Sequence, residues 1–163
     1  WDAIEKQAAN ATGAQANRPI PKRDVEIVTD GQKVTLGDTT ITLRITPGHT
    51  AGSLAYYIPV KDHGKPVTAL MLSGANITPD RESQLAFNRA LEAAKAAKAQ
   101  ALFNGHPGLF GDEMGWLEQV RNAPDGPNPF LMTPAQFSKF VDIMEDCAES
   151  RIVAMGLKSI KAK

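Results

Sequence analysis

The order of its secondary-structure signals is what most limits the fold of this chain. Short apolar runs come first, separated by turn residues, and Asp30-Gly31 and Gly37-Asp38 are typical of hairpin turns. These runs predict strands at residues 25–28, 33–36, 39–46 and 53–60. The later signals predict a buried strand at 67–74, a helix at 82–99 and a short strand running into a loop at 101–108. They predict two more helices at 112–121 and 134–154. This order predicts an α/β fold in which a mixed sheet carries helices on one face.

Two of these helices begin with capping signals. Asp112 is a plausible N-cap for the first, and Thr133 caps the second, with Pro134 at its first helical position. The rest of the chain has weaker patterns, since residues 1–24 read as a helix end followed by a loop and residues 155–163 as a frayed, basic tail. A length of 163 residues is enough for one ordinary domain.

Composition excludes several kinds of protein. Lysine and arginine number 18, the same as aspartate and glutamate, so charge gives no reason to expect a nucleic acid or an anionic membrane as partner. No apolar run is long enough to span a bilayer. The single cysteine, Cys147, excludes an internal disulfide and any cysteine-based zinc cluster.

The three histidines occupy two kinds of position. His63 lies in the polar hairpin tip "KDHGKP" and is expected to be exposed to solvent. His49 and His106 each follow a strand and sit beside glycine and proline, in "TPGHTAGS" and "FNGHPGLF". Loops at strand ends are common places for functional groups, and neutral imidazole is the commonest metal ligand, so both residues are candidate ligands of one metal centre. The alternative is that each is hydrogen-bonded to backbone. Two histidines do not complete a zinc site, because catalytic zinc usually has three protein ligands plus water.

The segments "WDAIEKQ", "RPIPKRD", "TPGHTAGS", "FNGHPG" and "VDIMEDCAES" resemble the second half of metallo-β-lactamase-fold hydrolases, particularly those similar to the subclass B3 β-lactamases. The resemblance covers nearly the whole chain. It implies the C-terminal half of an αββα sandwich whose complete form binds two zinc ions. On this resemblance His49 corresponds to the third histidine of one zinc site and His106 to the histidine of the other. The remaining ligands belong to an HxHxDH motif in the first half, which is absent here.

The resemblance also implies an activity. The parent protein is expected to be a zinc-dependent hydrolase in which zinc-bound hydroxide attacks a cyclic amide or a related ester, and the fragment alone is expected to be inactive. Subclass B3-like proteins are usually exported, so a periplasmic or secreted location is expected. Ser73 and Gly74 stand where other hydrolases of this fold carry an aspartate that bridges the two zincs, which favours the B3-like branch.

The substrate stays open at this point. Ser73 and Asn76 are candidate substrate contacts, but the segment "SGANIT" matches the serines of B3 enzymes poorly. A hydrolase of another lactone, ester or thioester, and a non-catalytic fragment or interaction module, are the alternatives. The missing half of the sandwich, or a second copy of the chain, is expected to cover the apolar sheet face that the helices do not. A small-molecule substrate is the other expected partner, with no nucleic acid and no membrane.

Overall fold

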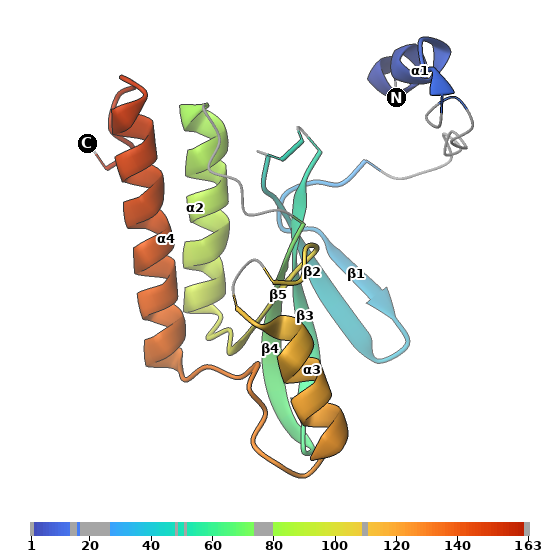
Figure 1. Cartoon of the computed structure of the whole chain (residues 1–163), viewed down its shortest axis with the longest axis vertical. Helices are drawn as coiled ribbons and strands as arrows, with labels where there is room; N and C mark the ends of the chain where they lie inside the picture. The colour runs from blue at the N-terminus through green and yellow to red at the C-terminus, as the bar shows by residue number, and fades with distance from the viewer. Residues whose placement is uncertain are drawn as a thin grey trace.

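The structure is a computed structural model that describes residues 2–13, 16, 27–47, 49–50, 52–73, 80–108 and 111–161. Its helices and strands are shown in Figure 1. In chain order they are α1 (Asp2–Ala9), β1 (Lys33–Leu36), β2 (Thr39–Ile45), β3 (Leu54–Asp62), β4 (Lys65–Leu72), α2 (Arg81–Ala96), β5 (Ala101–Asn104), α3 (Glu113–Asn122) and α4 (Pro134–Ala154). None of the helices within these ranges is long and apolar enough to cross a membrane.

The five strands form one mixed sheet in the order β1-β2-β3-β4-β5. Each of the first three strands pairs with the next in antiparallel fashion, whereas β4 and β5 are parallel and are joined through α2. Strands β2, β4 and β5 therefore run in the same direction and end at the same edge of the sheet. The predicted mixed α/β sheet is confirmed.

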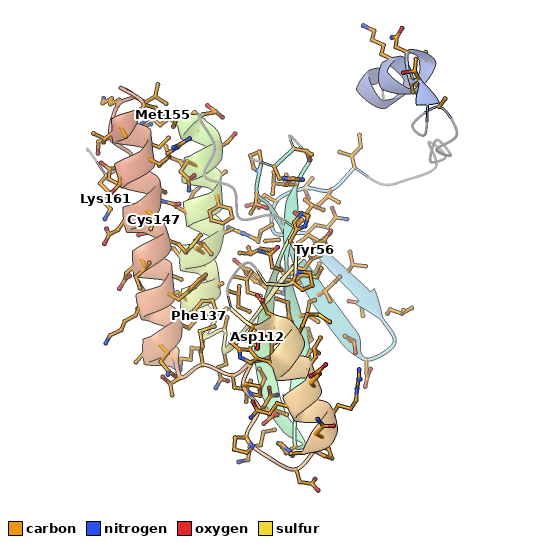
Figure 2. The ribbon with its side chains drawn as sticks, viewed as in Figure 1. Tyr56, Asp112, Phe137, Cys147, Met155 and Lys161 are labelled. Atoms are coloured by element: carbon orange, nitrogen blue, oxygen red, sulfur yellow. The ribbon has the colours of Figure 1, made fainter. Side chains whose placement is uncertain are left out.

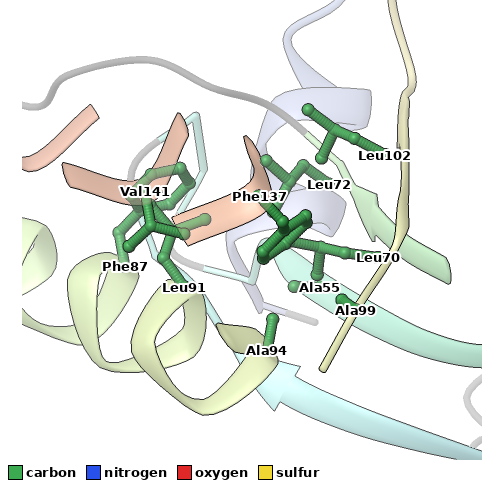
Figure 3. Packing of buried hydrophobic residues seen from close by; sticks show 10 residues of the cluster. All are labelled: Ala55, Leu70, Leu72, Phe87, Leu91, Ala94, Ala99, Leu102, Phe137 and Val141. Carbon is green, nitrogen blue, oxygen red and sulfur yellow. The ribbon is translucent and has the colours of Figure 1, made fainter. Parts of the chain in front are cut away.

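Helices α2 and α4 cover one face of the sheet, as the pattern predicted (Figure 1). The strand register places Ala55 opposite Leu72 and Leu70 beside Leu102, so these side chains point to the same face. They pack against apolar residues of both helices in a buried cluster, shown in Figure 3: Ala55, Leu70, Leu72, Phe87, Leu91, Ala94, Ala99, Leu102, Phe137 and Val141. Each buried leucine or phenylalanine contributes roughly 1.5–3 kcal/mol through removal of its apolar surface from water.

Tyr57 is a polar member of this helix-covered face. Its hydroxyl donates a hydrogen bond of 2.5 Å to the carbonyl oxygen of Ala90 in α2. Burial raises the pKa of Tyr57 to about 12, because the phenolate would lose its hydration there. The contact ties β3 to α2 and keeps the polar end of the ring satisfied.

The opposite face of the sheet is covered only in part. Val67, Ala69 and Ala101 are buried there, with Ile58 and Leu131 packed against them. Apolar residues of the same face remain open near the sheet ends: Val34, Leu36, Val60 and Phe103 are 41%, 86%, 37% and 37% exposed. The expectation that this face leaves apolar strand residues uncovered is confirmed.

Most strand and helix ends differ from the sequence prediction by one to four residues, and three segments differ for reasons that local contacts show. Ile27 and Val28 lie outside any strand, and residues 25–26 lie outside the described residues. The chain enters a tight turn there, since Thr29 donates its backbone N–H to Gln32 Oε1 (2.9 Å) and accepts the N–H of Gln32 (3.0 Å). Helix α2 ends at Ala96 and not at residue 99, because Lys98 adopts a left-handed conformation (φ +54°).

The third difference is the basic tail. The backbone N–H groups of Ile160 and Lys161 donate to Glu149 Oε2 of α4, at 2.9 and 3.3 Å. Arg81, at the start of α2, donates to the carbonyl oxygen of Ser159. Residues up to 161 are thus held against α2 and α4, so the expectation of a frayed tail is wrong for this part of it.

Candidate metal centre

The edge at which β2, β4 and β5 end brings together three loops that are far apart in the sequence. His49 follows β2, Ser73 follows β4 and His106 follows β5. A loop that leaves a buried strand is anchored on one side by the sheet while its side chains reach solvent. Both histidines are exposed at this edge.

The imidazole rings of His49 and His106 are close to each other. Their centroids are 6.0 Å apart and their planes are inclined by 67°, an edge-on arrangement. The expectation that both residues point to the same rim of the sheet is confirmed. Their role as metal ligands stays a prediction.

The His49 loop is closed at its base by two buried residues. Thr46 donates its N–H to the carbonyl oxygen of Ser53 (2.9 Å), which continues the β2–β3 pairing by one step. Ser53 Oγ accepts the N–H of Thr50 (3.0 Å) and lies 3.2 Å from the Thr50 hydroxyl. Thr46 and Ser53 are only 4% and 8% exposed. Sequence reasoning missed Ser53 as a loop-shaping residue.

The His106 loop is held by acceptors on both sides of the histidine. His106 donates its backbone N–H to Asn104 Oδ1 (3.1 Å), and Gly105 donates to the carbonyl oxygen of Leu72 in β4 (3.1 Å). Gly108 donates its N–H to the carboxylate of Glu113 at the start of α3. Glu113 was not identified from the sequence, because only the folded chain brings its carboxylate to this loop.

Ser73 uses its hydroxyl for the sheet. Its Oγ accepts the N–H of Leu54 (3.0 Å), and its own N–H donates to the Leu54 carbonyl oxygen (3.2 Å), so it extends the β3–β4 pairing at the candidate site edge. Its assignment as a substrate contact stays a prediction. Gly74 and the other candidate substrate contact, Asn76, lie outside the described residues.

His63 lies at the other end of the sheet, in the β3–β4 turn, and is exposed as expected. It is nevertheless well tethered: Nδ1 is 3.1 Å from Asp62 Oδ2 and Nε2 is 2.9 Å from the carbonyl oxygen of Pro124. The Asp62 carboxylate and the Pro124 carbonyl raise the pKa of His63 above its ordinary value. The structure does not bring His63 together with the other two histidines.

The donor types at the edge suit zinc, but their number is incomplete. Neutral imidazole nitrogens are common zinc ligands, with bonds of about 2.0–2.1 Å, and paired metal ions in hydrolases lie about 3.5–4 Å apart. Rings 6.0 Å apart are therefore within reach of one ion or of two neighbouring ions. Within the described residues, however, no three side chains of histidine, cysteine, aspartate or glutamate form a group that could hold a metal ion. A full coordination shell needs donors from elsewhere.

Comparison with known proteins gives a consistent result at the level of structure. No protein-family model and no curated protein matches the chain. BJP-1 from Bradyrhizobium japonicum, a subclass B3 metallo-β-lactamase, matches 85% of the chain and 53% of its own length, with 25% identity and a TM-score of 0.64. The Rm3 metallo-β-lactamase matches 94% and 62%, with 18% identity and a TM-score of 0.64. The FEZ-1 enzyme from Legionella gormanii matches 79% and 51%, with 22% identity and a TM-score of 0.61.

The chain spans only about half the length of these solved structures. Its mixed sheet, with α2 and α4 on that face, corresponds to part of their fold. The chain thus has the fold of the metallo-β-lactamases and resembles their subclass B3 over about half of that fold.

Proposed function

We propose that this chain is the C-terminal half of a zinc-dependent hydrolase in which His49 and His106 are zinc ligands. The observation that carries the proposal is the approach of the two rings to 6.0 Å at the edge where β2 and β5 end. Similarity to solved metallo-β-lactamases supports the same reading. The aspartate and histidines that complete the coordination belong to the other half of the protein.

The part that this chain plays is to hold and orient two imidazoles. Each ring presents one nitrogen lone pair and must keep its other nitrogen bonded to an acceptor, which fixes the tautomer. Zinc held by these residues would supply Lewis acidity for the activation of water and of a carbonyl group. His49 and His106 act as ligands in this proposal and not as acid–base groups.

The uncovered face of the sheet is the surface for the missing half. Val34, Leu36, Val60 and Phe103 present exposed apolar side chains there. Exposed apolar patches of this kind are usually covered by another surface. The N-terminal half of the same protein is the proposed cover, and a second copy of this chain is the alternative. We place the parent protein in the periplasm or outside the cell, by analogy with related enzymes.

A cyclic amide is the preferred substrate class. The solved proteins that the chain resembles carry the name β-lactamase. A lactone, ester or thioester is the alternative, because zinc-assisted attack on a carbonyl serves all of these. A non-catalytic role for this chain is favoured only if the protein of natural length binds no metal.

The test uses the protein that contains this sequence, produced at its natural length. Metal analysis should find zinc, and a chromogenic β-lactam and a chromogenic lactone should be compared as substrates. Hydrolysis of either one with zinc, and its loss on chelation, supports the proposal. Bound zinc without activity on both substrates removes the hydrolase assignment for these classes. The 163-residue chain alone should show no hydrolysis.

A further inference from the structure

We propose that Glu113 is a positioning residue, which fixes the loop that carries His106 and thereby the direction of its ring. This inference rests on the proposed zinc-ligand role of His106. Glu113 is the first residue of α3, and its carboxylate accepts the backbone N–H of Gly108, two residues after the histidine.

The burial of Glu113 needs an explanation. Glu113 is only 7% exposed. Glutamate is rarely buried, because its carboxylate loses hydration in the protein interior. Helix capping does not supply the reason, because Asp112 is the N-cap and accepts the N–H of Gly115 (3.1 Å). The hydrogen bond to Gly108 explains the burial, because a bond between a backbone N–H and a charged acceptor offsets part of the lost hydration.

The loop is thereby fixed at both ends. On the β5 side, Asn104 Oδ1 accepts the N–H of His106 (3.1 Å). On the α3 side, Glu113 holds Gly108, whose φ of +92° lies in a region that glycine adopts readily and other residues do not. His106 lies between these two contacts, so its backbone direction depends on both.

Helix α3 is a firm support for this contact. Trp116 in α3 packs edge-on against Phe130 (centroids 5.5 Å apart), and Phe130 packs against Phe103 in β5 (5.4 Å). These aromatic contacts join α3 to the strand from which the His106 loop leaves. Figure 2 shows Asp112 at the N-terminal end of α3, where the His106 loop meets the helix. Glu113 therefore attaches the loop to a helix that is itself packed against β5.

Such a tie matters because metal affinity depends on how well a ligand is oriented before binding. Loss of an outer group that orients a ligand typically lowers metal affinity about 10–100-fold. The side chain of Glu113 accepts a hydrogen bond from the backbone of the loop. We therefore expect Glu113 to act on the metal through the position of His106.

The experiment compares four variants of the protein at natural length. Glu113→Ala removes the acceptor and Glu113→Gln keeps its shape without the charge. Glu118→Ala removes an exposed glutamate of the same helix as the matched control. Asp112→Ala removes the N-cap contact without touching Gly108, and so reports on destabilisation alone. The readouts are hydrogen exchange at the Gly108 amide, inter-ring contacts of His49 and His106 by NMR in the metal-free protein, and zinc affinity.

We expect Glu113→Ala to speed exchange at Gly108 about tenfold, to weaken the contacts between the rings, and to lower zinc affinity about 10–100-fold. For Glu113→Gln, the exchange rate at Gly108 and the zinc affinity should fall between those of Glu113→Ala and the wild type. If Glu113→Ala does not fold, Glu113→Gln serves as the test in its place. Glu118→Ala should match the wild type, and Asp112→Ala should lower the melting temperature with zinc affinity unchanged.

The proposal is overturned if Glu113→Ala leaves Gly108 exchange and the ring contacts as they are. It is also overturned if Asp112→Ala lowers zinc affinity as much as Glu113→Ala. A wild-type protein that binds no zinc would refute the proposed function, whereas the two metal-free readouts would still decide whether Glu113 positions the loop.

Discussion

The rings of His49 and His106 lie 6.0 Å apart, although β3 and β4 separate the strands that they follow. The approach is made by the loops and not by the strands. Buried Thr46 and Ser53 close one loop, and Asn104 and Glu113 hold the other. The first predictions concern what depends on this pair of rings.

Removal of the ligand histidines should affect the activity of the natural-length protein unequally. His49→Ala should remove most of the zinc-dependent hydrolysis, and His106→Ala should reduce it less if one metal ion alone supports turnover. His63→Ala should change kcat/KM little, because His63 lies at the other end of β3 and β4. The measurement is kcat/KM for all three variants on one β-lactam and one lactone. A larger loss for His63→Ala than for the other two would show that the ligand assignment is wrong.

The strands and helices of this chain were predictable because local signals agree with the final structure. Asp112 and Thr133 cap α3 and α4 as predicted, and Pro134 begins α4. The end of α2 was missed, because Lys98 takes the left-handed conformation that glycine usually marks. Local sequence patterns therefore located the regular elements better than the points at which they end.

The candidate site was predictable only in part. The positions of His49 and His106 after strands, together with the family resemblance, placed them at one rim. The contacts of Ser53 and Glu113 depend on loops and helices that meet only in the folded chain, so no local pattern announced them. The remaining zinc ligands are not found as a group within the ranges that the structure describes.

Ser53→Ala should loosen the His49 loop. The substitution leaves the Thr50 N–H without its side-chain acceptor, and loss of such a bond costs about 1 kcal/mol in the free energy of unfolding. Zinc affinity should fall with it, because the loop then samples more conformations. Urea unfolding and zinc titration measure the two effects. Ser150→Ala, at an exposed position of α4, is the control and should change neither.

The tether between His63 and Pro124 should respond to pH. Asp62 first, and the Pro124 carbonyl second, raise the pKa of His63 in the folded protein. Both ring nitrogens face oxygen acceptors, so the doubly protonated ring makes both bonds. The tether therefore stabilises the fold fully below the unfolded pKa of about 6.5, and this contribution is lost as pH rises through the higher folded value.

Urea unfolding of the wild type and of His63→Gln between about pH 5 and pH 8.5 measures this contribution. The difference in stability should be largest at the acidic end and should shrink toward the alkaline end. The charged groups that act on the tether are Asp62, Lys65 and Asp125, and Asn128 donates to Asp62 Oδ1 (2.9 Å). A difference that grows with pH would show that the neutral ring, and not the imidazolium, makes these contacts.

A pair of substitutions on β1 should identify what covers the exposed apolar face of the sheet. Val34 lies on that face by register with Ile41, and Thr35 points to the other side of the strand. If the N-terminal half covers this face, Val34→Asp should destabilise the natural-length protein by about 2 kcal/mol or more, because a buried carboxylate loses its hydration. Thr35→Asp should cost less, about 1 kcal/mol or below, because it loses only the exposed hydrogen bond between the Thr35 and Thr40 hydroxyls (2.8 Å). In the 163-residue chain alone both variants should lose similar amounts of stability, since Val34 is already 41% exposed there.

Chemical unfolding of both variants, each at natural length and as the 163-residue chain, gives the four changes in the free energy of unfolding. Equal effects at natural length would mean that this part of the face stays open, and a concentration-dependent loss for Val34→Asp in the short chain would identify a second copy as the cover.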